Sequence, residues 1–531
     1  MRKYLVNACI GLAVLCSACA SSNLPLATNR TEVPEAWHLA DPEQDSIGGT
    51  SVVKAYQTLL AGKKPQREVV VAVIDSGIDI EHEDLKDNIW TNTDEVAGNG
   101  KDDDGNGYID DVHGWNFIGD VSVDTYEMTR IYGQLAPKYE GKTLAEVDNK
   151  EEFKLFKKVE LAFNEERNQY EEQAKQFMPF YMQFERATEI LQDTLGQEFT
   201  AQQLEVFEPE TQDQTTAKGI YSYAIANGFS PKEIVEYKDY LAEKLEYQLN
   251  PDFDSRSLVG DNYSNLQEKS YGNNEYEGAD ARHGTHVAGI IAATRNNNIG
   301  IDGIAPAKIM VLRAVPNGDE RDKDIANAIR YAVDNGAHII NMSFGKSYSP
   351  QKQAVDDAVR YATQKGVLLI HAAGNESLNT DVEDNFPTRT YLTSSDEPLW
   401  LEIGASGWGA GPAFVAEFSN YGRKNVDLFA PGVDIYSTVP DSKYEDLSGT
   451  SMAAPVVSGV AALIMAYYPN LTGQQVKEIL IKSSIRPKKL EVSKPGEDPA
   501  SAEAAVQFKD LSRTGGLVNA YKALQLAEKK K

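Results

Sequence analysis

The chain has 531 residues, which is too long for one ordinary compact domain and indicates two or more structural units. Hydrophobic residues make up 41% of it, a proportion that supports a packed core and excludes a fibrous or disordered protein. The formal net charge is −28, from 80 acidic and 52 basic residues. A chain this acidic is repelled by phosphate backbones, which argues against nucleic acid as a partner.

The N-terminus has the pattern of a secretory signal. Arg2 and Lys3 precede an apolar run over residues 5–15, which is too short to be a permanent transmembrane helix. All three cysteines of the chain lie within the first nineteen residues. The rest of the chain therefore contains no disulfide and no cysteine-bound zinc.

The stretch from Cys16 to Cys19 resembles a bacterial lipobox, although Cys16 stands where leucine is common. The resemblance implies a signal peptide over residues 1–18 and lipidation of Cys19. The protein would then be an exported outer-membrane lipoprotein with a membrane anchor, on either the periplasmic or the cell-surface face. The alternative is a soluble export signal that is cut near Ala18 or Ala20.

Strands and helices alternate in the parts of the chain that flank residues 120–276. Residues 19–65 form a polar N-terminal extension with one helix expected near 51–61, and the apolar run 68–74 predicts a buried parallel strand that ends at Asp75. Further strands are predicted at 308–314, 338–342, 367–372 and 401–405, and helices at 324–335, 351–365 and 451–468. This alternation predicts an α/β fold over residues 66–119 and 277–531, in which helices cover both faces of a mostly parallel sheet.

Residues 120–276 have a different pattern. Apolar residues recur at helical spacing over 151–177 among Glu, Lys, Asn and Gln, which predicts a helix about 40 Å long. Pro179 is expected to kink or end this helix. A second helix is predicted over 230–247, because Ser230, Pro231 and Glu233 form a capped helix start. We interpret this block as an all-α insertion.

Three segments carry side chains for nucleophilic chemistry. Asp75 ends the first strand, His283 opens one predicted helix and Ser451 opens another. A hydroxyl nucleophile needs an imidazole to take its proton, and the imidazole needs a carboxylate that orients it. The order Asp, His, Ser is that of subtilisin-type triads and differs from the order in chymotrypsin-type enzymes.

In these motifs the chain resembles the subtilisin-like serine peptidases, or subtilases, over about 66–119, 277–485 and 515–520. The resemblance implies a three-layer fold and an endopeptidase that hydrolyses protein or peptide substrates through an acyl-enzyme on Ser451. It makes Asp75 the orienting acid, His283 the general base and His286 a structural residue. The related sedolisins use Glu as the base, and His283 argues against them.

The resemblance extends to the oxyanion hole and the substrate strand. Residues 371–376 resemble the oxyanion segment, in which the Asn375 amide and the Ser451 N–H would bind the oxyanion. Residues 341–345 resemble the edge strand that holds the substrate backbone. The implied substrate-binding residues are Ser343, Phe344, Gly345, Ala372, Ala373 and Gly374. Phe344 and the wall 372–374 are expected to form a P1 pocket that favours apolar side chains.

The loop 99–111 is predicted to bind a structural calcium ion, because its spacing is that of a calcium loop without the terminal Glu. The expected ligands are Asp102, Asp104, Asn106, the Tyr108 carbonyl and Asp110. The alternative is a solvated turn. Calcium would brace the loops and take no part in the chemistry.

A second calcium site follows from the resemblance alone. Residues 82–85 and 296–301 resemble the two halves of the family's stabilising site, although a further N-terminal ligand is not found. The implied ligands are Asp84, Asn297 and the carbonyls of Ile299 and Ile301.

The separation of 208 residues between Asp75 and His283 departs from the family pattern. The insertion must emerge near the active-site face, where it gates access or binds a partner. The alternative is that it is a passive spacer or an oligomer contact. Three alternatives to an active peptidase stay open: a degenerate pseudoenzyme, a protease-fold scaffold whose insertion captures a partner, and a transpeptidase. The chain between Cys19 and Glu68 is too short for a folded inhibitory propeptide.

Overall fold

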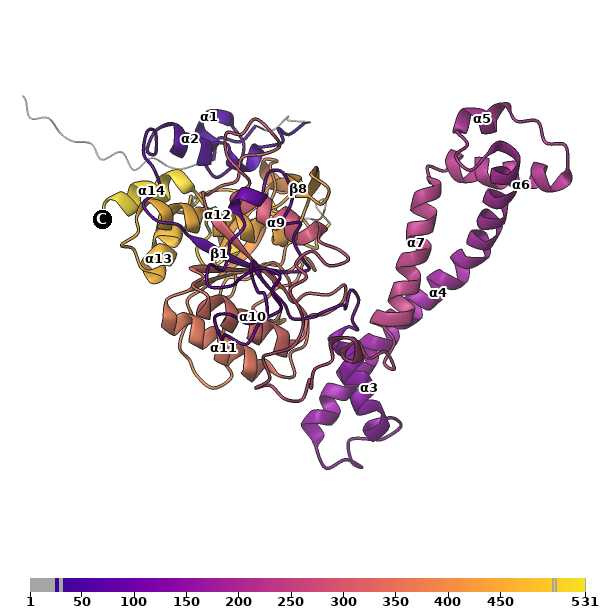
Figure 1. The fold of residues 1–531 in the computed structure, drawn as a ribbon, viewed down its shortest axis with the longest axis horizontal. Coiled ribbons are helices and arrows are strands. Elements are labelled where there is room, and N and C mark those ends of the chain that lie inside the picture. Colours follow the sequence, from indigo (N-terminus) through magenta and orange to yellow (C-terminus); the bar gives the residue numbers. More distant parts are fainter. Residues whose placement is uncertain (1–23, 28–31, 499–500, 502–503, 531) are drawn as a thin grey trace, which may run out of the picture.

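A computed structural model describes residues 24–27, 32–498, 501 and 504–530. The predicted signal peptide and Cys19 lie outside the described residues. Figure 1 shows a rounded α/β body from which a long helical arm projects. We call residues 120–276 the arm and the rest of the described chain the body.

A seven-stranded sheet forms the centre of the body. Its spatial order is β2-β3-β1-β4-β5-β6-β7, and all neighbouring strands are parallel. The strands are β1 (Val70–Asp75), β2 (Gly114–Asn116), β3 (Lys308–Arg313), β4 (Ile339–Met342), β5 (Leu368–Ala372), β6 (Trp400–Ser406) and β7 (Leu428–Pro431). Two small antiparallel pairs lie outside this sheet: β8 (Ile435–Val439) with β9 (Lys443–Leu447), and β10 (Glu491–Ser493) with β11 (Ala505–Gln507).

Side chains alternate between the two faces of the sheet, because successive residues of a strand point in opposite directions. In β1, Val71 and Val73 enter one hydrophobic core, and Ala72 and Ile74 enter the other. Helices cover both cores (Figure 1). On the first face they are α9 (Arg282–Ala292), α12 (Thr450–Tyr467), α13 (Gly473–Ser483) and α14 (Ala520–Glu528), and on the second α10 (Asp322–Asp334) and α11 (Lys352–Lys365).

This arrangement confirms the predicted three-layer α/β fold. Within the described residues, α12 is the one helix long and apolar enough to cross a membrane, and 94% of it is buried inside the body. It is therefore the central core helix.

The N-terminal extension is more deeply packed than its polar composition suggested. It contains α1 (Pro42–Asp45) and α2 (Val52–Gln57), and Trp37 and Leu39 are buried in the first core. It also joins the C-terminal end of the chain: Asn519 Nδ2 donates to Ser51 Oγ over 2.7 Å. Segments near the two ends of the described chain therefore pack against each other in the body.

The arm consists of helices, as predicted. They are α3 (Glu127–Tyr139), α4 (Lys150–Leu195), α5 (Ala201–Val206), α6 (Gln212–Ala226), α7 (Pro231–Glu243) and α8 (Arg256–Val259), with a π-helical turn over Lys244–Gln248 after α7. Helices α4 and α7 run side by side along the arm, and α5 and α6 lie at its tip (Figure 1).

Helix α4 is 46 residues long and contains Pro179 in its interior. Of the two expected effects of this proline, a kink or an end of the helix, the end is therefore wrong. A proline inside a helix costs about 3 kcal/mol because it removes a hydrogen bond and crowds the preceding turn. The tip cluster on both sides of Pro179 offsets this cost. It consists of Phe184, Ala187, Leu191, Leu204, Ala217, Tyr221, Ala224 and Ile234, with Phe177 and Phe180 against it.

Buried ion pairs fix the base of the arm to the body. Glu127 of α3 pairs with Lys346 of the body at 2.8 Å, and Arg256 of α8 pairs with Asp324 of α10 at 2.6 Å. Tyr271 also donates to Asp324, over 2.7 Å. The base is therefore anchored by buried charges on both of its chain segments.

Candidate active site

Asp75 and His283 meet at the carboxyl edge of the sheet, where β1 ends and α9 begins. The His283 Nδ1 atom lies 2.7 Å from Asp75 Oδ1. Burial alone lowers the pKa of His283, but the negative charge of Asp75 and its hydrogen bond raise the pKa above its ordinary value. The carboxylate therefore fixes the ring orientation and favours a proton on the ring.

The close approach of α9 to β1 requires glycine at position 284. A Cβ atom there would lie 2.1 Å from the Gly77 carbonyl oxygen and 3.1 Å from Asp75 Cβ. His286, three residues after His283, is buried with Nε2 3.1 Å from the Glu445 carbonyl oxygen. Its ring thus contacts β9 rather than Asp75.

Ser451 lies in the first turn of α12, facing the end of β4. Its Oγ donates to the Ser343 carbonyl oxygen over 3.1 Å, and Ser343 Oγ donates back to the Ser451 carbonyl over 2.9 Å. Among the described residues no hydrogen bond joins Ser451 to His283, and the Ser451 hydroxyl is directed at Ser343. Hydrogen bonds of catalytic groups often tighten only when substrate is bound.

Asn375 is held against the start of α12. Its side-chain oxygen accepts from the Thr450 N–H at 2.8 Å and from the Thr450 hydroxyl at 3.0 Å. This leaves the Asn375 amide nitrogen as the donor, beside the first N–H groups of α12, which have no partner within the helix. A side-chain amide donor from Asn375 and backbone N–H donors from α12 therefore lie at the helix start that carries Ser451.

The segment 343–345 continues past the carboxyl end of β4. Strand β4 includes residues 341 and 342 and lies between β1 and β5, so the expectation that residues 341–345 form an edge strand is wrong for these two residues. His371 positions the segment, because its Nε2 lies 2.8 Å from the Phe344 carbonyl oxygen and its Nδ1 lies 2.9 Å from Glu402. Ala372 and Ala373 are buried beside it, and Gly374 is half-buried.

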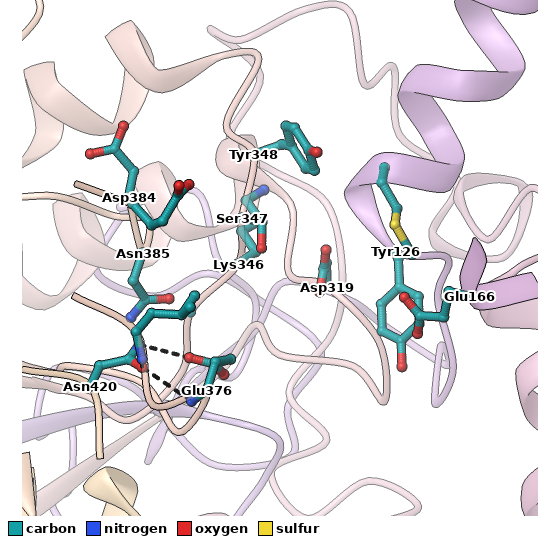
Figure 2. Close-up of a pocket in the computed structure, with 14 residues that line it drawn as sticks. Tyr126, Glu166, Asp319, Lys346, Ser347, Tyr348, Glu376, Asp384, Asn385 and Asn420 are labelled. Atoms are coloured by element: carbon teal, nitrogen blue, oxygen red, sulfur yellow. Dashed lines mark hydrogen bonds between the residues drawn. The ribbon is translucent and has the colours of Figure 1, made fainter. Parts of the chain in front are cut away.

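Two cavities flank the segment 343–345. One, of about 290 Å³, is lined by Asp75 and His283. The other, of about 320 Å³, lies between the body and the arm, and Figure 2 shows the residues on its two sides. Gly345 lines both cavities.

The acidic loop forms a cluster that differs from the predicted ligand set. Carboxylate oxygens of Glu95, Asp104 and Asp111 lie within 4.8 Å of one another. Asp102 instead accepts from the backbone N–H groups of 105, 106 and 107, and Asp110 from those of 99 and 100. Of the three predicted carboxylate ligands, Asp102, Asp104 and Asp110, only Asp104 belongs to this cluster.

The remaining predicted ligands of this loop lie around the cluster. The Asn106 amide donates to Asp104 and Asp111, over 3.0 and 2.9 Å, and Tyr108 packs its ring against the body core. Asp111 lay within the motif that the sequence singled out. Glu95 lies outside this motif, and no local pattern in the sequence links it to Asp104 and Asp111. Only the folded loop brings the three carboxylates together.

The second predicted site has its two halves together. Asp84 is fully buried, and its carboxylate accepts from Asn297 Nδ2 at 2.6 Å and from the Ile301 N–H at 3.1 Å. The Ile299 N–H donates to Asn297 Oδ1. Burial raises the pKa of Asp84, and these hydrogen bonds oppose the shift.

Comparison with known proteins places most of the chain in a single protein family. A model of the subtilase family matches residues 66–515. The thermophilic serine proteinase of Bacillus sp. (strain AK1) is 38% identical over 247 residues, which are 46% of this chain and 54% of that protein. The major intracellular serine protease of Bacillus subtilis (strain 168) is 39% identical over 223 residues, 41% of this chain and 65% of that protein.

The chain thus matches less than two thirds of the length of these relatives. Among solved structures, one described as proteases from Pseudoalteromonas arctica PAMC 21717 aligns with 94% of this chain and 99% of its own, at 20% identity and a TM-score of 0.46. The family model spans the segments that carry Asp75, His283, Asn375 and Ser451. The chain belongs to the subtilase family.

Proposed function

We propose that this protein is a serine endopeptidase that hydrolyses peptide bonds through an acyl-enzyme on Ser451. The observation that carries the proposal is the 2.7 Å hydrogen bond between His283 and Asp75 at the sheet edge where α12 presents Ser451. Membership of the subtilase family supports it.

His283 takes the Ser451 proton as Oγ attacks the substrate carbonyl carbon, and Asp75 stabilises the imidazolium that forms. His283 then gives this proton to the leaving amine, which breaks the peptide bond. Water, deprotonated by the same imidazole, hydrolyses the ester. Asn375 and the Ser451 N–H donate to the oxyanion, and loss of one such donor costs about 10²- to 10³-fold in kcat.

Labelling with a fluorophosphonate tests this proposal. Wild type is expected to be labelled at Ser451 and to hydrolyse peptides, and Ser451→Ala is expected to lose labelling and about 10⁶-fold in kcat. Ser394→Ala, in an exposed loop, is the control and keeps both activities. An unlabelled, inactive wild type would point to a pseudoenzyme, and hydrolysis by Ser451→Ala at the wild-type rate would refute the mechanism.

We also propose that calcium binds the cluster of Glu95, Asp104 and Asp111. Carboxylates at this spacing repel one another unless a cation lies among them, and oxygen ligands suit Ca²⁺. The Glu95 Oε2 atom is buried without a hydrogen-bond partner among the described residues, which supports the fit. When bound, the ion would neutralise the cluster and hold the loop beside β2.

A chelator is expected to lower the melting temperature of the wild type, and Ca²⁺ is expected to restore it. Glu95→Gln should weaken this response if the ion binds the cluster, and Asp84→Asn should do so if it binds the second predicted site. An unchanged melting temperature in chelator would contradict calcium binding at either place.

Export and lipidation at Cys19 are supported by the sequence motif alone. Cys19→Ala is expected to move the protein from the membrane fraction to the soluble fraction. Cys16→Ala is the matched control, and it should leave the protein in the membrane. Mass spectrometry of the mature N-terminus separates lipidation from cleavage near Ala18 or Ala20.

A second candidate function is capture of a partner by the arm. Large apolar side chains are exposed near its tip, among them Met182 (65%), Val206 (73%), Tyr223 (63%) and Phe229 (55%). Deletion of residues 178–235, with a short glycine linker, would remove the tip and keep the base. Loss of partner capture with unchanged peptidase activity supports this role, and unchanged capture refutes it.

A further inference from the structure

The cavity between the arm and the body lies next to the two segments that would hold a substrate. Gly345 lines it, directly after Phe344, and Glu376 lines it, directly after Asn375. A side chain that precedes the scissile bond would point between these two segments. This placement rests on the proposed peptidase function.

The lining of this cavity is strongly acidic. Five carboxylates line it: Glu166, Asp319, Glu376, Glu383 and Asp384. Among the described residues that line it, Lys346 is the one basic residue, and its ammonium group lies 2.8 Å from Glu127 and 2.9 Å from Asp322. Those two acids lie outside the lining and hold Lys346, although Lys346 and Arg130 still act on Asp319. Glu383 lies 3.9 Å from Lys158, and among the described residues the other four carboxylates of the lining form no ion pair within 4.0 Å.

Two of the carboxylates, Glu376 and Asp319, are each held in place by a hydrogen bond to one of their two oxygens. Glu376 Oε2 accepts from Asn420 Nδ2 at 2.7 Å, as Figure 2 shows, and Asp319 Oδ2 accepts from the Glu127 N–H at 2.8 Å. Acceptors that are fixed before binding lose little conformational freedom when a donor arrives. The cavity is therefore organised to receive a group that donates hydrogen bonds.

The arm supplies one side of the cavity, through Tyr126, Met128 and Glu166 (Figure 2). Burial raises the pKa of Glu166; nearby Lys244 opposes the shift, and Asp319 of the body adds to it. The Lys244 ammonium also lies 4.7 Å from the centre of the Tyr126 ring. The arm and the body thus face each other with carboxylates that repel one another.

The occupant that fits this lining is a long cationic side chain. A metal ion needs several carboxylates that converge on one point, and among the described residues such a group of three is found only at Glu95, Asp104 and Asp111. Here the carboxylates lie on opposite sides of about 320 Å³, a volume in the range of ligand pockets.

We propose that this cavity binds the arginine or lysine side chain that precedes the scissile bond, and that the arm forms part of this specificity pocket through Glu166. The pocket differs from the apolar P1 site that Phe344 and residues 372–374 suggested. Glu376 and Asp319 position the cationic group from the body, and Glu166 does so from the arm.

Peptide substrates that differ only in the residue before the scissile bond test the proposal. The full-length enzyme is expected to give kcat/KM values about 10- to 100-fold higher for arginine than for leucine, the range of hydrogen bonds to charged groups. Equal values, or a preference for leucine or phenylalanine, would overturn it.

Variants test the individual carboxylates through the ratio of kcat/KM for arginine to that for leucine, which is insensitive to partial loss of folded enzyme. Glu376→Gln and Glu166→Gln are each expected to lower the ratio several-fold. Glu185→Gln, on the same helix as Glu166 but at the exposed tip of the arm, is the matched control and should leave the ratio unchanged. An unchanged ratio in Glu166→Gln would overturn the contribution of the arm.

Active-site titration with fluorophosphonate in the same samples separates this proposal from the proposed function. An enzyme that is labelled but prefers leucine remains a serine peptidase and overturns only the cationic pocket. An enzyme that is neither labelled nor active overturns the proposed function and this inference together.

Discussion

The body and the arm use apolar packing in different ways. In the body, strands β1, β3, β4, β5 and β6 each send side chains into two large cores that helices cover from both sides. In the arm, α4 divides its buried side chains among three small clusters, which lie at the tip, at the base beside the body and at the connection between α3 and α4. Stability is therefore collective in the body and local in the arm.

This difference in packing corresponds to what each region contributes to the candidate site. Asp75, His283 and Ser451 come from separate elements, and their geometry depends on the whole body core. The arm contributes a pocket wall through a short length of α3 and α4 next to its base. The base must be rigid for that purpose, whereas the tip can change with little effect on the site.

After that of Ser451→Ala, the largest expected effect is on catalysis in the body, without a change in its packing. Asp75→Asn is expected to lower kcat by about 10⁴-fold, because the amide neither fixes nor stabilises the protonated ring of His283. The general base must be neutral, so wild-type kcat/KM should fall as the pH drops through an apparent pKa above about 6.5.

In Asp75→Asn, burial still lowers the pKa of His283, but the carboxylate that raises this pKa is lost. The inflection of the pH–rate profile should therefore move to lower pH. A pH–rate profile of both proteins checks this. An inflection that stays in place would show that His283 is not the titrating group. Asp79→Asn, in the loop that follows β1, is the control and should leave the inflection in place.

The next effect tests how firmly the arm is joined to the body. Glu127 is buried, which raises its pKa, but Lys346 and Arg130 lower it to about 2. Glu127→Gln leaves these cations without their shared partner and should lower the free energy of unfolding by about 3–5 kcal/mol. Denaturant unfolding measures this change.

The pH dependence of this pair has a definite sign. Because the folded pKa is depressed, Glu127 stabilises the protein above the unfolded pKa near 4.5, and this stabilisation is lost between about pH 5 and pH 2. The variant should lack that part of the acid response. Glu152→Gln removes an exposed pair with Lys138 and should change nothing measurable. If the two variants showed the same change in unfolding free energy with pH, the buried Glu127 pair would not be what anchors the arm to the body.

The smallest effect on the whole molecule is expected at the tip. Phe184 is 2% exposed in the tip cluster, and Phe184→Ala should destabilise that cluster by about 3–5 kcal/mol. Limited proteolysis in the Ser451→Ala background should show new cuts between residues 177 and 234. Met182→Ala, which is largely exposed, is the control. A matching loss of body stability would contradict local stability of the arm.

Features that depend on a few consecutive residues could be predicted from the sequence. Strand β1 and the starts of α9 and α12 were recognised because their motifs are local and their apolar patterns are strong. The three-residue strand β2 was missed, since so short a segment has no periodicity and is defined by its pairing with β3. The sequence places Trp37 in a polar extension, because the polar residues around it mask its burial.

Features that depend on distant residues required the fold. Glu95 joins Asp104 and Asp111 only when the loop closes, and Glu166 faces Asp319 only when the arm docks on the body. Pro179 suggested a helix end because its local cost is clear in the sequence, whereas the packing that offsets it comes from α5, α6 and α7. Local signals thus predicted the candidate catalytic residues, and tertiary packing determined their surroundings.

The pairing of the two chain ends has a consequence for the order of folding. Asn519 and Ser51 are 468 residues apart, so their contact forms only after nearly the whole chain has been synthesised. Contacts between such distant residues form slowly, because a long loop must first be closed. Helix pairs such as α4 and α7 have shorter-range contacts, so the arm is expected to form early. Once formed, it brings Asn116 and Asn273 close together, where they pair, and so shortens the loop between Asp75 and His283. An early-folding arm is therefore expected to speed the assembly of the site in the body.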